Sequence, residues 1–121
     1  MNEVDFYKIE STQKLERGWL MIFVLNPNHQ IFEGHFPGNP VLPGVCMIQM
    51  VKDAVANMTG KKWLLSEARQ IKFLEMIIPN EKDVFSFLLN YEVDNAECLV
   101  RASFEKDGKT LFKFQGCFQQ I

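Results

Sequence analysis

Hydrophobic and polar positions divide the chain into short apolar segments, one long helical segment and a loop that precedes it. Residues 19–25 form a continuous apolar run that stops at Asn26-Pro27, which predicts a buried strand. Residues 26–43 contain four of the five prolines, so we expect a long loop rather than a helix or a central strand. Residues 5–14 have a mixed pattern, which predicts a short helix or an irregular lead-in.

The segment after this loop has the pattern of one long helix. Apolar residues occupy nearly every side of residues 44–59, which is typical of a buried helix. Gly60 stands where glycine commonly ends a helix. Gln49, Asp53 and Asn57 are spaced by four residues, so they fall on one polar stripe along the helix.

The remainder of the chain predicts an antiparallel sheet. Alternating and apolar stretches indicate strands at residues 63–73, 84–93, 97–105 and 110–118. A turn is expected at residues 79–83, and Asp107-Gly108 marks a tight hairpin. We therefore expect a single α+β domain over residues 1–121, in which an antiparallel sheet wraps around one long buried central helix.

Composition limits the classes of binding partner and the cellular compartment that we expect for this protein. The formal net charge is -2, so no basic surplus points to nucleic acid or to an anionic membrane surface. The apolar runs are too short to span a bilayer, and the first residues lack the apolar core of a secretion signal. The three cysteines are widely spaced, which argues against a disulfide framework or a zinc site. We expect a cytoplasmic protein with reduced thiols.

The loop before the helix carries the candidate chemistry. His35 lies in the glycine- and proline-rich segment 34–44, and histidine is the natural proton carrier near neutral pH. Gly44 stands at the predicted helix start, where backbone N–H groups are free and the helix dipole is positive. Such an N–H can polarise a carbonyl whose oxygen gains negative charge, and glycine lets a substrate approach closely.

Residues 34–45, Gly-His-Phe-Pro-Gly-Asn-Pro-Val-Leu-Pro-Gly-Val, resemble the signature of the 3-hydroxyacyl-acyl carrier protein dehydratases of fatty acid synthesis. Residues 70–79 are similar to the strand and turn that follow the helix in that family. The resemblance implies the hot-dog fold and a hydro-lyase acting in fatty acid or related acyl-chain biosynthesis. It also implies an acyl carrier protein or coenzyme A thioester as substrate, with no metal or redox cofactor. A homodimer, a higher even assembly or a heterodimer with a related chain is expected.

The same resemblance implies roles for individual residues. His35 would remove the proton from C2, and the Gly44 N–H would bind the thioester oxygen. Phe36, Pro37 and Val45 would lie against the substrate as part of the motif.

The helix departs from the family pattern at its polar stripe. The family carboxylate, fourteen residues after the histidine, falls on Gln49, and Asp53 stands where the family often has glutamine. A glutamine can donate a hydrogen bond but carries no acidic proton. Our hypothesis is that Asp53 protonates the departing hydroxyl, directly or through a water, while Gln49 orients that hydroxyl.

Other interpretations of these residues remain open. Gln49 could be a polar core residue, and Asp53 could belong to a solvated helix face with Lys52 and Asn57. His35 could be a buried structural histidine. A hot-dog thioesterase could use Asp53 to activate water, and a non-catalytic subunit that binds acyl thioesters would explain Gln49.

Overall fold

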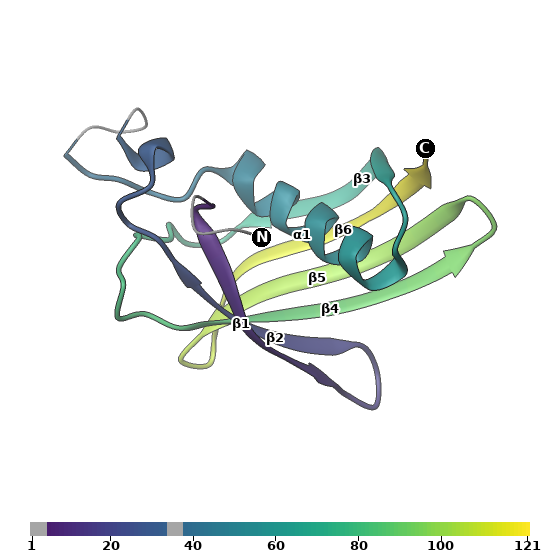
Figure 1. Cartoon of the computed structure of the whole chain (residues 1–121), viewed down its shortest axis with the longest axis horizontal. Coiled ribbons are helices and arrows are strands. Elements are labelled where there is room, and N and C mark those ends of the chain that lie inside the picture. The colour runs from purple at the N-terminus through teal and green to yellow at the C-terminus, as the bar shows by residue number, and fades with distance from the viewer. Residues whose placement is uncertain (1–4, 34–37) are drawn as a thin grey trace.

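One antiparallel sheet and one long helix make up the computed structural model, which describes residues 5–33 and 38–121. Six strands pair in the order β1-β2-β4-β5-β6-β3, and α1 lies across one face of the curved sheet (Figure 1). The elements are β1 (Tyr7–Lys14), β2 (Trp19–Leu25), a 3-10 turn (Gln30–Phe32), α1 (Gly44–Thr59), β3 (Trp63–Phe73), β4 (Phe85–Asp94), β5 (Glu97–Lys106) and β6 (Lys109–Gln120). This architecture confirms the predicted α+β plan.

The limits of α1 agree with those predicted from the sequence. Pro43 is the N-cap with an extended backbone, and the helix begins at Gly44. Gly60 takes a left-handed conformation at φ 71° and donates its N–H to the Ala56 carbonyl at 2.9 Å. Glycine suits this position because it adopts positive φ without steric cost. No helix in the described part of the chain is long and apolar enough to cross a membrane.

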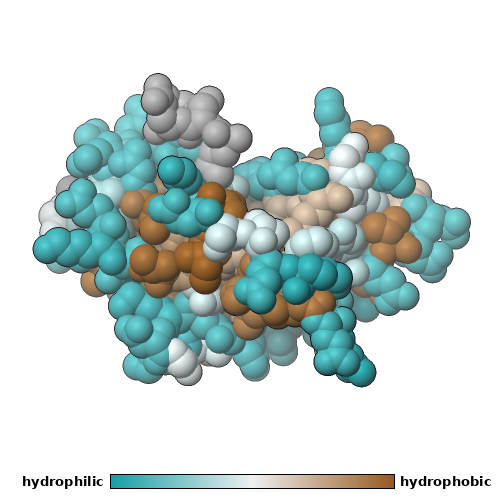
Figure 2. Space-filling model, turned by 60° about the horizontal axis from the view of Figure 1, so that its bottom comes forward, coloured by the Kyte–Doolittle hydropathy of each residue, from teal (hydrophilic) through white to brown (hydrophobic). Residues whose placement is uncertain are grey.

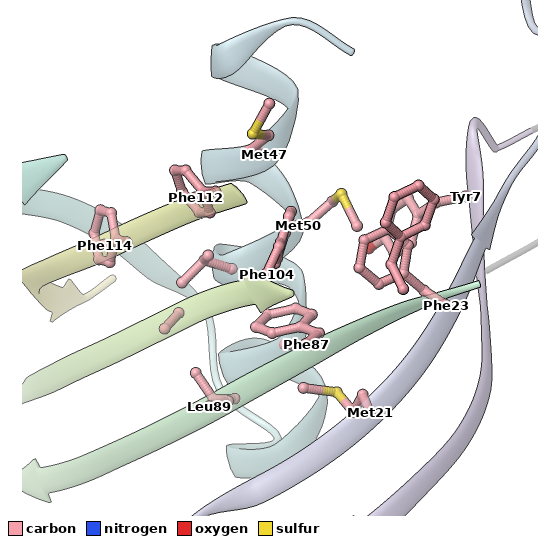
Figure 3. Close-up of a cluster of buried hydrophobic side chains, with 14 of the residues drawn as sticks. Tyr7, Met21, Phe23, Met47, Met50, Phe87, Leu89, Phe104, Phe112 and Phe114 are labelled. Atoms are coloured by element: carbon pink, nitrogen blue, oxygen red, sulfur yellow. The ribbon is translucent and has the colours of Figure 1, made fainter. Parts of the chain in front are cut away.

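Aromatic side chains from the sheet form the centre of the core beneath α1. Phe104 is fully buried, and its ring centroid lies 5.0 Å from that of Phe23 and 4.9 Å from those of Phe87 and Phe112. Figure 3 shows Met50 reaching from α1 toward this face of the sheet. The helix is therefore held in place by apolar contacts along its buried side.

The prediction for residues 5–14 was wrong, because most of this segment forms the edge strand β1. Tyr7 to Lys14 pair residue by residue with β2, across a bulge between Ile9 and Ser11. Most β1 side chains are exposed, so the segment lacks the apolar alternation that would have revealed a strand. Pairing with the apolar strand β2 decides its conformation, rather than a pattern of its own.

The expectation that α1 is buried on all sides was also wrong within this chain. Met50, Val51 and Val55 have no exposed surface, but the side chain of Val45 is 76% exposed and Gln49 faces solvent. The sheet covers only one side of the helix, which leaves its outer side open. Separate apolar patches on the molecular surface lie among polar side chains (Figure 2).

The later strands confirm the predicted sheet with small shifts at their ends. Strands β4, β5 and β6 begin or end one or two residues away from the predicted limits. The Asp107-Gly108 hairpin joins β5 to β6, with positive φ at both residues. Both positions favour residues without bulky side chains, as the sequence indicated.

Replacing Phe104 by alanine should destabilise the fold strongly. The substitution removes a fully buried ring from the centre of the aromatic cluster, so we expect a loss of about 3–5 kcal/mol in the free energy of unfolding. Urea denaturation followed by fluorescence measures this loss. Phe73→Ala is the matched control, because the Phe73 ring is 52% exposed. Equal losses from the two substitutions would contradict the placement of the core.

Candidate functional site

The helix start is anchored to the segment that follows β3. The buried residue Leu42 donates its N–H to the Ile77 carbonyl at 2.8 Å, which fixes the chain just before Pro43 and Gly44. Four residues of the predicted motif, Gly34, His35, Phe36 and Pro37, lie outside the described residues. The geometry of the site is therefore built from the helix and from the strands that contact it.

Gly44 lies directly under the ring of Phe73, the last residue of β3. A Cβ atom placed on Gly44 would lie 2.6 Å from the Phe73 Cζ, which is closer than side-chain atoms pack. Any larger residue would push this half-exposed ring away from the helix start. The structure thus gives a packing reason for glycine here, in addition to the close substrate approach expected from the sequence.

The first turn of α1 contains backbone donors that have no acceptor within the described residues. Cys46 and Met47 donate their N–H groups to the Pro43 carbonyl at 3.0 and 3.3 Å. Within residues 5–33 and 38–121, no acceptor is found for the N–H groups of Gly44 and Val45. Free donors at the positive end of a helix dipole favour a partly negative oxygen. The side chain of Val45 is exposed beside them.

Gln49 and Asp53 form a bonded pair across one turn of α1. The Gln49 Nε2 donates to the Asp53 Oδ1 at 2.7 Å, which confirms that the two residues share one face of the helix. Gln49 is exposed, so it is not a polar core residue. Asp53 is half-buried and has a second partner, so it is more than part of a solvated helix face.

The second partner of Asp53 is Tyr7, which the sequence did not suggest as a site residue. The Tyr7 hydroxyl donates to the Asp53 Oδ2 at 2.8 Å, across 46 residues of sequence. Tyr7 begins β1, a strand that the hydrophobic pattern does not reveal, so no local signal connected it to the helix. Both carboxylate oxygens of Asp53 therefore accept hydrogen bonds, one from the core side and one from the surface side.

The environment of Tyr7 keeps its hydroxyl protonated. Burial, and then the hydrogen bond and negative charge of Asp53, raise the pKa of Tyr7 well above its ordinary value of 10.0, with a smaller contribution from Asp5. Ionising Tyr7 would place a second negative charge beside the Asp53 carboxylate in a buried position. The hydroxyl is consequently a steady hydrogen-bond donor to Asp53 across the ordinary pH range.

Cys46 is a poor nucleophile despite its place in the first turn of α1. Burial raises the pKa of the Cys46 thiol, which lowers the fraction of reactive thiolate at neutral pH. No group of three or more histidine, cysteine, aspartate or glutamate side chains in the described residues is placed to hold a metal ion. The polar chemistry of the described site therefore centres on Gln49, Asp53 and Tyr7.

An apolar cavity of about 210 Å³ lies between the second half of α1 and the strands β1, β2 and β4. Its lining includes the Tyr7 ring and the side chains of Met50, Met58 and Phe87. A larger, open hollow of about 420 Å³ is lined by Arg17, Arg101 and Lys113 among others, and it includes none of the predicted site residues. The smaller cavity meets the candidate site only through Tyr7, because its lining includes neither Gln49 nor Asp53.

Comparison with protein families identifies the family to which the chain belongs. Residues 10–115 match the model of the ApeI-like family, which is described as ApeI dehydratase. The chain belongs to the ApeI-like dehydratase family. The match covers every strand at least in part and the whole of α1, so the recognised resemblance to hot-dog dehydratases is confirmed at the family level.

Similar sequences are named as 3-hydroxyacyl-acyl-carrier-protein dehydratases. The ApeI-like chain is 36% identical over 61 residues to the 3-hydroxyacyl-acyl-carrier-protein dehydratase FabZ of Clostridium acetobutylicum, covering 45% of this chain and 43% of that protein. It is 29% identical over 86 residues to the FabZ of Symbiobacterium thermophilum, covering 64% and 61%. The matches span about half the length of these relatives.

Similar solved structures have the same fold. The ApeI-like chain superposes with a TM-score of 0.74 on a chain of the dehydratase heterocomplex ApeI:P from Xenorhabdus doucetiae, at 19% identity and covering 93% and 96% of the two chains. A hypothetical thioesterase with coenzyme A from Streptococcus pneumoniae gives a TM-score of 0.62 at 15% identity, covering 95% and 85%. These likenesses confirm the hot-dog fold and do not choose between reactions.

Removing the Tyr7 hydroxyl should change how stability depends on alkaline pH. Because the folded pKa lies above the unfolded value, the unfolded chain loses this proton first as the pH rises past 10.0. The wild type should therefore lose about 1 kcal/mol more than Tyr7→Phe between pH 8 and pH 11. Denaturant unfolding at a series of pH values measures the difference.

The thiol of Cys98 also has a raised pKa, of about 11, and contributes a loss of the same sign in both proteins. The comparison between wild type and variant therefore isolates Tyr7. Identical pH profiles for the two proteins would show that Tyr7 is exposed to solvent rather than bonded to Asp53.

Proposed function

We propose that this protein dehydrates a 3-hydroxyacyl thioester carried by an acyl carrier protein or coenzyme A. The reaction removes the C2 proton and the C3 hydroxyl, which leaves as water, and forms the C2–C3 double bond. The observation that carries the proposal is the bonded pair of Gln49 and Asp53 on the helix that follows the His35 motif. Membership of the ApeI-like dehydratase family and the names of the similar proteins support it.

In this proposal His35 is the base and the start of α1 holds the thioester. His35 accepts the C2 proton, and the electron pair of the broken C–H bond forms the new double bond. The negative charge that gathers on the thioester oxygen is stabilised by the N–H of Gly44, for which the described residues offer no acceptor. Phe36, Pro37 and Val45 flank the thioester, and the side chain of Val45 is exposed at that end of the helix.

In the same proposal, Gln49 and Asp53 act on the departing hydroxyl of the substrate. The Gln49 amide faces solvent and keeps a second N–H and its carbonyl available after bonding to Asp53, so it can orient the hydroxyl. In its protonated form Asp53 gives its proton to the departing hydroxyl, directly or through a bridging water, and the carboxylate that remains accepts from Tyr7 and Gln49. The 2.7 Å bond between the two side chains supports their action as one unit.

Two substitutions test these roles. His35→Ala and Asp53→Asn should each lower the rate of enoyl formation roughly 10²–10⁴-fold, because each removes a proton-transfer group. The measurement is the rise of enoyl absorbance when a 3-hydroxyacyl thioester is added. Asp83→Asn is the matched control, since the Asp83 carboxylate pairs with Lys106 on the surface instead. Full activity in Asp53→Asn would remove Asp53 from the mechanism.

A second chain along the edge strand β3 would complete the site in this proposal. Strand β3 ends the sheet and pairs only with β6 among the described strands, while Leu64, Leu65 and Phe73 are substantially exposed. Unpaired edges and exposed apolar side chains favour pairing with another chain. The heterocomplex named for the ApeI:P structure supports either a second copy or a related chain as partner.

This assembly also supports a second candidate function, that of a subunit whose partner supplies the carboxylate. Gln49 at the family's carboxylate position favours it. A chain that binds acyl carrier protein yet forms enoyl product only when mixed with a carboxylate-bearing relative would establish this candidate. Activity of the purified chain alone would exclude it. The thioesterase alternative is supported only by likeness of fold.

Introducing a lysine on the edge strand should weaken association. Leu65→Lys places a charge on β3, and we expect the dissociation constant of the assembly to rise at least about tenfold. Leu99→Lys is the matched control, because Leu99 on the interior strand β5 is 40% exposed and Leu65 is 39% exposed. Sedimentation equilibrium measures both. An unchanged assembly in Leu65→Lys would place the interface elsewhere.

A further inference from the structure

Tyr7 reaches the polar stripe of α1 from inside the core. Its side chain is 6% exposed, and its ring centroid lies 4.8 Å from that of Phe6. Figure 3 shows the Tyr7 ring beside Phe23, with Met50 of α1 pointing toward both rings. Packing on several sides fixes the ring, so the hydroxyl has one place to point, which is the Asp53 Oδ2 at 2.8 Å.

The two donors to Asp53 differ in how firmly they are held. Gln49 is exposed on the outer side of α1, and long exposed side chains exchange between rotamers freely. The Tyr7 hydroxyl is attached to a rigid, buried ring on a strand of the sheet. The Tyr7 hydroxyl is therefore the firmer of the two donors to Asp53. The carboxylate that it holds in turn fixes the Gln49 amide through the hydrogen bond from Nε2 to Oδ1.

The two oxygens of Asp53 have partners on opposite sides of the pair. Oδ2 accepts from the buried Tyr7 hydroxyl, so Oδ1, which accepts from the exposed Gln49 amide, is the oxygen on the surface side of the pair. The raised pKa of Tyr7 means that the hydroxyl keeps its own proton and does not serve as the acid. Its effect on the reaction would pass entirely through Asp53.

We propose that Tyr7 is a positioning residue for dehydration, which holds Asp53 so that Oδ1 and the Gln49 amide face the departing hydroxyl together. The inference rests on the proposed dehydratase function, and it adds a residue outside the His35 motif and outside α1. The site then consists of a buried positioning residue on the edge strand β1 and of Gln49 and Asp53 on the helix.

The first test is Tyr7→Phe, which retains the ring and removes only the hydroxyl. We expect kcat for a 3-hydroxyacyl thioester to fall roughly tenfold, with KM changed less than about twofold, because a hydrogen bond to a charged group is lost while binding contacts remain. Tyr91→Phe is the matched control, since Tyr91 is the other tyrosine and also packs against the core. Unchanged kcat in Tyr7→Phe would overturn the inference.

A double-mutant cycle separates positioning from a general loss of stability. If Tyr7 acts through Asp53, adding Tyr7→Phe to Asp53→Asn should change kcat less than about twofold beyond Asp53→Asn alone. Independent effects would instead multiply, and that outcome would also overturn the inference. Thermal unfolding of each variant shows that the proteins compared are folded at the assay temperature.

A readout that does not need activity keeps this inference distinct from the proposed function. The side-chain amide protons of Gln49, observed by NMR, should exchange with water at least about threefold faster in Tyr7→Phe than in wild type or Tyr91→Phe. Unchanged exchange would show that Tyr7 does not hold the pair. If the wild type forms no more enoyl product than His35→Ala, the proposed reaction is overturned. The role of Tyr7 in that reaction is then overturned with it.

Discussion

The contact between α1 and the phenylalanine-rich face of the sheet sets the position of every described residue of the candidate site. Met50, Val51 and Val55 are fully buried against this face, so the helix cannot turn about its axis without exposing them. With that side fixed, Gln49 and Asp53 must lie on the outer flank, because their spacing places them off the buried stripe. The apolar core thus orients a polar pair that is not part of the hydrophobic cluster.

The buried core also contacts the candidate site through Tyr7. One end of this side chain belongs to the buried aromatic cluster, and the other end donates to Asp53. A phenol suits such a junction because its ring tolerates complete burial while its hydroxyl still finds a polar partner. The half-buried carboxylate of Asp53 gains a rigid donor, and the strand β1 gains a specific contact with the helix.

The outer side of α1 and the edge strand β3 leave apolar surface exposed on the single chain. The exposed side chains of Val45, Leu64 and Phe73 are apolar, and β3 has a free edge in the described structure. The Phe73 ring, at the end of β3, covers Gly44 at the start of the helix. A partner on this side would therefore lie close to the start of the helix, where the thioester is proposed to bind.

The sequence by itself determined those features that depend on neighbouring residues. It predicted both ends of α1, from the loop that precedes Gly44 and from Gly60, and it predicted the hairpin at Asp107-Gly108. The spacing of Gln49 and Asp53 was enough to predict their contact, because residues four apart on a helix are neighbours whatever the rest of the fold does. The motif around His35 was enough to indicate the family.

Only the tertiary structure decided the features that join distant segments. Residues 7–14 form a strand because they pair with β2. Tyr7 donates to Asp53 across 46 residues of sequence. The sheet covers one side of α1, which no pattern within the helix could reveal, since its residues are apolar on nearly every side. Such contacts arise from the packing of whole elements, and a local pattern carries no information about which distant side chain will lie opposite.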